Sequence, residues 1–515
     1  MSEVDNKLPI ALPPGIFRNG TQYQAKGRWY DAHLVRFFEG TIRPVGGWAV
    51  MKDASGVDFT LGTGLPRGAH AWRANDSTTW FAVGTVGLDG GANQTKAKAL
   101  SGQTITDITL SGGSPQVQCT QNGVNAGRAY GQQLFGLGLY GDPGSGAVLT
   151  DCDVWSFDNF GEELLAVSTC DGRLMRWDKN IANDLAVVAG APTGNKGIVV
   201  TPERFAFVLG AGGVYRRVQW PDQESLTVWT ETSTNQAGSW DLQTSGKILN
   251  GKRTTTETLI WTDIDLHVAT YVGPPFVYRF DPKCHNCGAI GPHAMTVLGD
   301  KAYWMSHDSF YVWDGRVIPI PSEVSDYVFG DIARVQRCKV FAWAVPAFNE
   351  VWWFYPSRDV LDKENDRYVV YNTVERHWTV GRLGRAAGAG TTVTLSPILA
   401  AKGGKLFQHE TGDDRDTEVP YVESGPIEIG QGERYIDVQK IIPDEKTVGD
   451  ATVTFFIKNT PSTSTTETTK GPFSLAQETS ARFQARQVRM RIAQNIETGW
   501  RVGVFRLEFV LGDRR

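Results

Sequence analysis

The segment MTVLGDKAYWMSHDSFYVWDGRVIPI, residues 295–320, is the clearest indication of the fold of this chain. It contains four short runs of aromatic and β-branched residues, which are typical of β-strands. The runs are separated by Gly299-Asp300, by His307-Asp308-Ser309 and by Asp314-Gly315, residue types that favour tight turns. The segment therefore predicts four consecutive antiparallel strands, the content of one β-propeller blade or of part of a large β-sandwich.

Similar units recur along the chain. The clearest repeats occupy residues 164–178, 204–220, 259–280 and 339–380, and weaker ones lie at 79–83 and 397–408. The units start roughly 40–55 residues apart, which is the period of four-stranded blades. We therefore predict an all-β fold, a degenerate β-propeller of about six or seven blades. A pair of β-sandwiches is the alternative, because regular strands separated by turns suit both architectures.

Composition and charge limit the class of protein. The 57 glycines and 17 tryptophans suit many turns and wide aromatic packing. No window keeps an apolar i, i+3, i+4, i+7 pattern, so no long helix is predicted. The net charge of −5 argues against a general nucleic-acid binder, although it suits a protein past which DNA slides.

The cellular location is predicted from what the sequence lacks. Residues 1–15 have neither a basic region nor a long apolar run, so no signal peptide is expected, and no segment has the length of a membrane span. Six scattered cysteines predict no disulfide framework. We therefore expect a soluble protein made in the cytoplasm.

The chain divides into three parts. Residues 50–415 are expected to form the propeller, with an insertion at about 85–155, where the spacing of the blades nearly doubles. Residues 416–515 contain strand-like runs and predict a C-terminal β-sandwich, here called the platform. Residues 1–49 supply N-terminal strands that join the platform, because a short hairpin is marginally stable alone.

Residues 15–48, GIFRNGTQYQAKGRWYDAHLVRFFEGTIRPVGGW, carry the most specific pattern. The segment resembles the opening of the tail nozzle proteins of short-tailed bacteriophages, also called tail tubular B or packaged-DNA stabilisation proteins. The similarity continues at 67–85, 155–162, 500–503 and 512–515. The matched positions used below are Gly15, Arg18, Asn19, Gly20, Arg28, Trp29, Val35, Arg36, Pro44, Gly46, Gly47, Trp48, Trp500 and Gly503.

The resemblance implies a function without catalysis. Six copies would form a ring below the portal and adaptor of the virion, and would retain packaged DNA until it is ejected through the tail. The implied partners are further copies of this chain, the adaptor, tail fibre or tailspike proteins, needle or plug proteins, and DNA that passes without sequence-specific binding. The implied location is the virion tail, assembled in the host cytoplasm. No cofactor and no enzymatic activity are expected.

Arginine is dense near the C-terminus. Arg489, Arg491, Arg501 and Arg506 are the candidate interface residues, because arginine forms bidentate contacts with carboxylates. A solvated strand face and contact with the DNA backbone are the alternatives.

Other motifs indicate no chemistry. The G-x-G-x-x-G at 136–141 is followed by DPGSG, which cannot propagate a helix, so it predicts a turn. Cys284 and Cys287 have metal-ligand spacing near His293, but a structural zinc site needs four ligands. The carboxylate pairs at 162–163 and at 263 and 265 are interpreted as turn residues rather than as a hydrolase site. We therefore predict no metal, cofactor or catalytic residues. A propeller-fold glycan-degrading enzyme or an interaction scaffold is the alternative function.

Overall fold

The computed structural model describes residues 7–89, 92–93, 95–111, 119–125, 149–389, 393–394, 396–428, 435–458 and 467–511. Their regular secondary structure is almost entirely β-strand. The helices among them are α1 (Ser325–Asp331) and the short 3-10 helices η1 (Ala211–Gly213), η2 (Arg334–Lys339) and η3 (Pro346–Phe348). None of these described helices is long and apolar enough to cross a bilayer.

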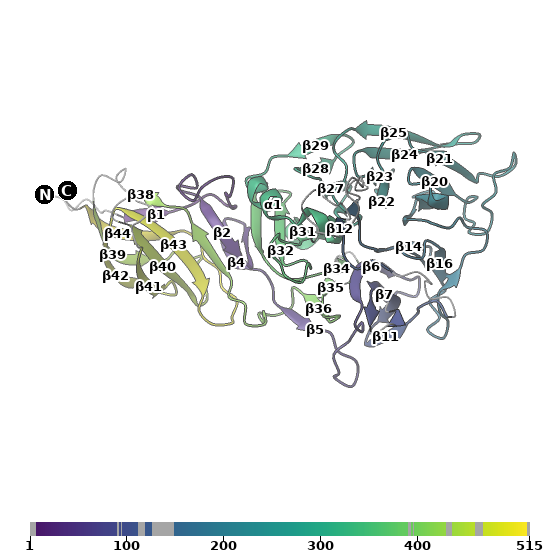
Figure 1. Ribbon diagram of the computed structural model, residues 1–515. Helices are drawn as coiled ribbons and strands as arrows, with labels where there is room; N and C mark the ends of the chain where they lie inside the picture. Colours follow the sequence, from purple (N-terminus) through teal and green to yellow (C-terminus); the bar gives the residue numbers. More distant parts are fainter. Residues whose placement is uncertain are drawn as a thin grey trace, which may run out of the picture.

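Seven four-stranded antiparallel sheets form a propeller in the described part of the chain (Figure 1). The strands of each blade are given from the axis outward. The first blade contains β6 (Leu65–Arg73), β7 (Thr79–Val86), β10 (Lys96–Ser101) and β11 (Thr104–Asp107). The second contains β14 (Trp155–Phe160), β15 (Glu163–Ser168), β16 (Leu174–Trp177) and β17 (Ala186–Val187), and the third contains β18 (Gly197–Val200), β19 (Ala206–Leu209), β20 (Arg217–Trp220) and β21 (Gly238–Asp241). The fourth blade contains β22 (Ile248–Arg253), β23 (Thr258–Thr262), β24 (Leu266–Gly273) and β25 (Val277–Cys284). The fifth contains β26 (Met295–Leu298), β27 (Lys301–Met305), β28 (Phe310–Trp313) and β29 (Val317–Ile320), and the sixth contains β30 (Phe341–Val345), β31 (Glu350–Tyr355), β32 (Arg367–Asn372) and β33 (Trp378–Arg382).

The inner strands close into one ring. Each inner strand lies beside the inner strand of the next sheet, and β34 (Ala387–Ala389) of the seventh sheet lies beside β6 of the first. Residues 295–320 form the four strands of the fifth blade, with both turn glycines, Gly299 and Gly315, at positive φ. The predicted all-β propeller is therefore confirmed.

The seventh blade is assembled from both ends of the chain. Its inner strands are β34, β35 (Ile398–Ala400) and β36 (Leu406–His409), and its outermost strand is β5 (Trp48–Val50), which pairs with β36. The expected boundary between residues 49 and 50 therefore falls inside a propeller strand. Pattern alone does not reveal this, since three residues are too few to show alternation.

The platform consists of two sheets, each with one N-terminal strand (Figure 1). One sheet contains β1 (Lys7–Ile10), β44 (Phe505–Leu511), β39 (Ile436–Ile442) and β42 (Thr479–Ala485); the other contains β2 (Trp29–His33), β37 (Tyr421–Ser424), β43 (Gln487–Gln494), β40 (Ala451–Lys458) and β41 (Thr468–Ser474), with β38 (Ile427–Glu428) on β43. Strand β40 alternates strictly between buried and half-buried residues, as expected for a sheet with one face in a core. The predicted sandwich formed by the chain ends is confirmed.

The expected insertion at 85–155 begins later than predicted. Strands β10 and β11, residues 96–107, complete the first blade, and their sequence lacks the aromatic residues that mark other blades. The short pairs β8 (Leu88–Asp89) with β9 (Ala92–Asn93) and β12 (Val124–Asn125) with β13 (Leu149–Thr150) are also described. The glycine motif at 136–141 and the terminal residues 512–515 lie outside the described residues.

All six cysteines are paired, so the expectation of no disulfide framework is wrong. The disulfides join Cys119 to Cys170, Cys152 to Cys338, and Cys284 to Cys287. Two of them span 51 and 186 residues of sequence. The closure of the propeller brings these cysteines together, and their spacing in the sequence gives no sign of it.

Candidate functional site

The segment that carries the family resemblance lies where the platform meets the propeller. Strand β2 pairs with β37 of the platform, while the hairpin of β3 (Val35–Phe38) and β4 (Thr41–Pro44) continues toward β5 in the seventh blade (Figure 1). One apolar cluster runs through this region and includes Phe37, Trp353 of the sixth blade and Phe455 of the platform. We call the region where residues 15–48 contact both parts the junction.

Arg36 is the most highly bonded side chain of the junction. Its guanidinium donates two hydrogen bonds of 3.1 Å to the Glu350 carboxylate and two, of 3.0 and 2.6 Å, to the Glu410 carboxylate. It also lies 3.6 Å from the centre of the Phe348 ring. The exposed fractions of the Arg36, Glu350 and Glu410 side chains are 4%, 3% and 14%. The sixth blade and the segment after β36 are therefore joined through one N-terminal arginine.

A second set of contacts links the start of the segment to the connection between β29 and α1. The Asn19 side-chain amide donates to the Ser322 carbonyl at 2.7 Å and accepts from the Asp326 backbone N–H at 3.0 Å. Arg28 forms an ion pair with Glu323 at 2.5 Å, and Arg18 pairs with Asp31 at 2.7 Å. These polar residues therefore hold the loop before β2 against the fifth blade.

Gly46, Gly47 and Trp48 pack against the chain that follows β36. An added Cβ would lie 2.7 Å from the Glu410 Cα at position 46 and 2.4 Å from the Asp414 carbonyl oxygen at position 47. Both positions therefore require glycine. Trp48 donates from its indole N–H to the Asp416 carboxylate at 2.6 Å.

The remaining matched residues are structural as well. Gly15 has a φ of +93°, and its backbone approaches His377 closely enough that only glycine fits. At Gly503, a Cβ would overlap the Asp444 carboxylate. The others are placed as follows: Trp29, Val35 and Trp500 are buried, Gly20 occupies a turn at positive φ, and Pro44 pairs with Val35 across the hairpin.

The four candidate interface arginines have different surroundings. Arg489 forms ion pairs with Glu423 and Glu467 of its own chain. Arg491 stacks 3.8 Å from the centre of the Tyr421 ring, and the Arg501 Nε donates to the Lys446 carbonyl at 2.8 Å. Arg506 is exposed on β44. These arginines do not form one uniform positive face, and no sequence pattern indicates the glutamates that pair with Arg489.

A second candidate site is a cavity of about 350 Å³ on the propeller axis, which we call the axial pocket. The innermost strands of all seven blades line it. Its charged and titratable residues are His70, Asp158, Lys252, Arg253 and His293. In the sequence, His293 stands out only beside the cysteine pair, and no pattern singles out the other four as pocket residues, since the sequence does not show which strand of a blade faces the axis.

Local bonding determines the electrostatics of this pocket. The two carboxylate oxygens of Asp158 accept hydrogen bonds from the backbone N–H groups of Asn159 and Val200, each at 2.8 Å. Burial lowers the pKa of Lys252, and the neighbouring Asp158 carboxylate opposes this shift. Burial and the Lys252 charge lower the pKa of His293 to about 4, so this imidazole is neutral near pH 7.

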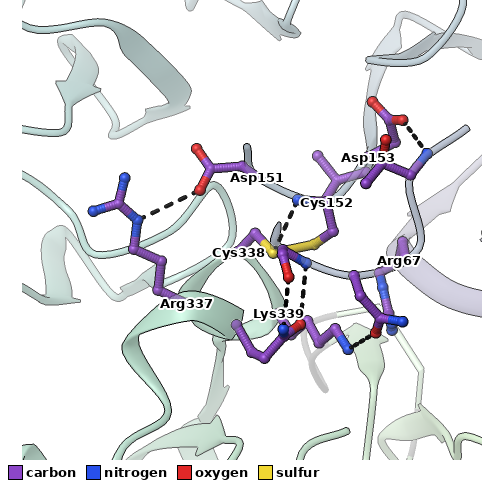
Figure 2. Close-up of a disulfide and its surroundings, with 12 residues drawn as sticks. Arg67, Asp151, Cys152, Asp153, Arg337, Cys338 and Lys339 are labelled. Atoms are coloured by element: carbon purple, nitrogen blue, oxygen red, sulfur yellow. Dashed lines mark hydrogen bonds and ion pairs between the residues drawn. A yellow bond between two sulfur atoms is a disulfide. The ribbon is translucent and has the colours of Figure 1, made fainter. Parts of the chain in front are cut away.

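Buried residues close one end of the axis. Glu364 accepts hydrogen bonds from Arg67 at 2.7 Å and from Lys339 at 2.8 Å, and burial lowers the pKa of Lys339 to about 8. Beside them, the Cys152–Cys338 disulfide links the chain before β14 to η2, across the ring from the second blade to the sixth (Figure 2). The axial pocket therefore ends at a floor of ion pairs and one disulfide.

The carboxylates and cysteines considered from sequence do not assemble into a catalytic or metal centre in the described residues. Asp265 is buried and bonds Thr244 and His285, while Asp263 accepts from the Lys247 backbone. Glu162 and Glu163 form ion pairs with Lys179 and Arg176. One group has metal-ligand spacing, Cys119, Asp153 and Cys170, but the disulfide uses both of its sulfur atoms.

Comparison with known proteins gave structural matches only. No protein-family model and no curated protein matches the sequence. Virginiamycin B lyase from Staphylococcus aureus is 10% identical with a TM-score of 0.38, over 67% of this chain and 94% of that chain. The Dos1 propeller is 9% identical with a TM-score of 0.38, over 73% and 93%. The Neurospora crassa Pan2 WD40 domain is 7% identical with a TM-score of 0.37, over 75% and 100%. Values this low do not indicate a shared function.

Proposed function

We propose that this chain is a virion structural protein that forms the tail nozzle of a short-tailed bacteriophage. In this proposal, copies of the chain form a ring of six subunits, as in the proteins it resembles, below an adaptor. The ring retains packaged DNA and conducts it during ejection. Further tail proteins would attach to the same ring, which is assembled in the host cytoplasm.

The observation that carries the proposal is the junction. Residues that match the nozzle family bond the N-terminal segment to the sixth blade and to the segment after β36, above all Arg36 with Glu350 and Glu410. In a closed ring, one face of each subunit contacts a different face of its neighbour, and the same contact repeats around the ring. The ring therefore closes only if each subunit holds these two faces at a fixed orientation. Buried, multiply bonded ion pairs at the junction meet this requirement.

Two further features agree with the proposal. The net charge of −5 suits a wall that does not trap the phosphate backbone. Disulfides persist outside the reducing cytoplasm, and a released virion is exposed to such an oxidising medium.

The test is the mass and location of the assembled protein. Six copies of 56.6 kDa make a ring of about 340 kDa, which mass photometry separates from a monomer. Mass spectrometry and cryo-electron microscopy of purified virions would then locate the chain in the tail. A protein that stays monomeric, does not bind an adaptor ring and is missing from virions would overturn the proposal.

The alternative is a propeller-fold glycan-degrading enzyme or an interaction scaffold. A two-carboxylate hydrolase places its pair about 5–10 Å apart around the substrate. Asp158 is the one carboxylate among the described residues that line the axial pocket, and both of its oxygens are bonded to backbone. This bonding argues against a two-carboxylate hydrolase at the axial pocket, and it leaves the interaction scaffold as the second candidate function.

A further inference from the structure

The axial pocket contains two cations that a purely structural role does not explain. Lys252 and Arg253 end β22, the innermost strand of the fourth blade, and both line the cavity. Neither forms a hydrogen bond or ion pair with any residue in the described part of the chain. Elsewhere on the same blade, Arg279 pairs with Asp281 and Lys247 with Asp151.

The nearest carboxylate does not neutralise these cations by pairing with them. Asp158 directs one oxygen to the Asn159 N–H and the other to the Val200 N–H. It is near enough to affect the pKa of Lys252, yet it makes no ion pair with it. Two positive charges and one bonded carboxylate leave the pocket with a net positive charge.

His293 lies in the same wall. Its Nε2 is buried and makes no hydrogen bond of good geometry among the described residues, although backbone groups of Arg67 and Trp155 contact the imidazole and raise its pKa. The two cations therefore carry the positive charge of this wall, while the imidazole is neutral near pH 7.

We propose that the axial pocket binds a compact oxyanion, a molecule that carries a phosphate or carboxylate group, through Lys252 and Arg253. Charge-assisted bonds from an ammonium and a guanidinium to an oxyanion are short and strong. This site does not depend on the proposed tail function, because it uses only the inner strands of one propeller.

The shape of the cavity limits the ligand and its route of entry. Its volume of about 350 Å³ is near the lower end of the range of small-molecule sites, so a small anion fits and a macromolecule does not. The Glu364 ion pairs and the Cys152–Cys338 disulfide close one end of the axis. Arg253 and Gly299 are exposed at the other end, where the inner strands finish, so the ligand enters there.

The test is isothermal titration of the full-length protein, separately with inorganic phosphate and with citrate, in chloride buffer at constant ionic strength. We expect saturable binding of at least one of them. Lys252→Met should weaken this binding about ten-fold or more, and Arg253→Gln by a similar or smaller factor. Arg316→Gln, at an exposed arginine in the turn between β28 and β29, is the matched control and should bind as the unchanged protein does.

Each outcome decides a specific point. Binding of phosphate alone assigns the phosphate class, and binding of citrate alone assigns the carboxylate class. No saturable binding of either up to about 10 mM, which would fill a site of millimolar affinity, overturns the proposal. Equal binding by the Lys252→Met and Arg316→Gln proteins also overturns it. If Lys252→Met fails to fold by circular dichroism, the exposed Arg253→Gln provides the test, and binding equal to that of Arg316→Gln then overturns the proposal.

Discussion

Replacing Arg36 by methionine tests whether the junction holds the two parts of the molecule together. The change removes four hydrogen bonds and leaves the Glu350 and Glu410 carboxylates without their cation. Removal of one partner from a buried ion pair typically costs about 3–5 kcal/mol, because the other charge stays buried. The unfolding entropy is about 2.1 cal/mol/K per residue, or about 1.1 kcal/mol/K for all 515 residues unfolding as one unit. We therefore expect the Tm to fall by about 3–5 °C.

The same variant has a pH dependence of known sign. Burial raises the pKa of Glu350, Glu410 raises it further, and Arg36 lowers it. In the Arg36→Met protein the pKa of Glu350 should therefore be higher than in the unchanged protein. A carboxyl group whose pKa is raised by folding stabilises the fold below its unfolded pKa, and this stabilisation is lost as the pH rises through the folded pKa. The loss of folding stability caused by Arg36→Met should therefore be larger at pH 8 than at pH 5.

Differential scanning calorimetry at both pH values measures the effect, with Arg316→Met as the exposed control. Adding Glu350→Gln and Glu410→Gln to Arg36→Met should restore part of the lost stability, since the buried charges are then absent. A Tm within 1 °C of the control, or an equal deficit at pH 5 and pH 8, would refute the reasoning about this ion pair.

Three other predictions concern single contacts. Cys152→Ser with Cys338→Ser should lower stability by up to about 5 kcal/mol, from the loop of 186 residues, and calorimetry without reductant measures the loss; an unchanged Tm would contradict a stabilising bond. Trp48→Phe deletes the hydrogen bond to Asp416 and should cost about 1.5–3 kcal/mol, less than Arg36→Met, in the same assay. Arg489→Gln leaves Glu423 unpaired, while Glu467 keeps its ion pair with Lys458 at 3.7 Å, and should lower the Tm of the purified protein; if it instead affects only the mass of the proposed ring, the arginine acts between subunits.

The parts of the fold that were predictable are those encoded locally. In residues 295–320, turn residues and β-branched or aromatic runs alternate within a few positions, and both Gly299 and Gly315 have the positive φ that such turns need. The weaker blades followed from the same signals. Strands β10 and β11 were missed because they carry the turn glycine without the aromatic residues.

The parts that were not predictable depend on contacts between distant segments. Arg36 was identified in a motif, but its partners lie 314 and 374 residues further along the chain. The Cys152–Cys338 pair and the inner-strand position of Lys252 follow from the way the propeller closes. A sequence pattern reports which residues form a strand, whereas the closure of the ring decides what those residues face.

The closure of the propeller also explains why one short segment near the N-terminus has so many constrained residues. Residues 15–48 begin in a loop held against the fifth blade, pass through the platform in β2, bond the sixth blade through Arg36, and end in the strand that completes the seventh blade. Each of these steps is a contact with a segment hundreds of residues away. Deleting the whole segment would therefore remove the closure of the propeller, a strand of the platform and the junction together. Such a deletion cannot separate folding from the proposed ring assembly, whereas single changes at Arg36, Trp48 and Arg489 can, because each removes the contacts of one side chain and leaves the strand pairing in place.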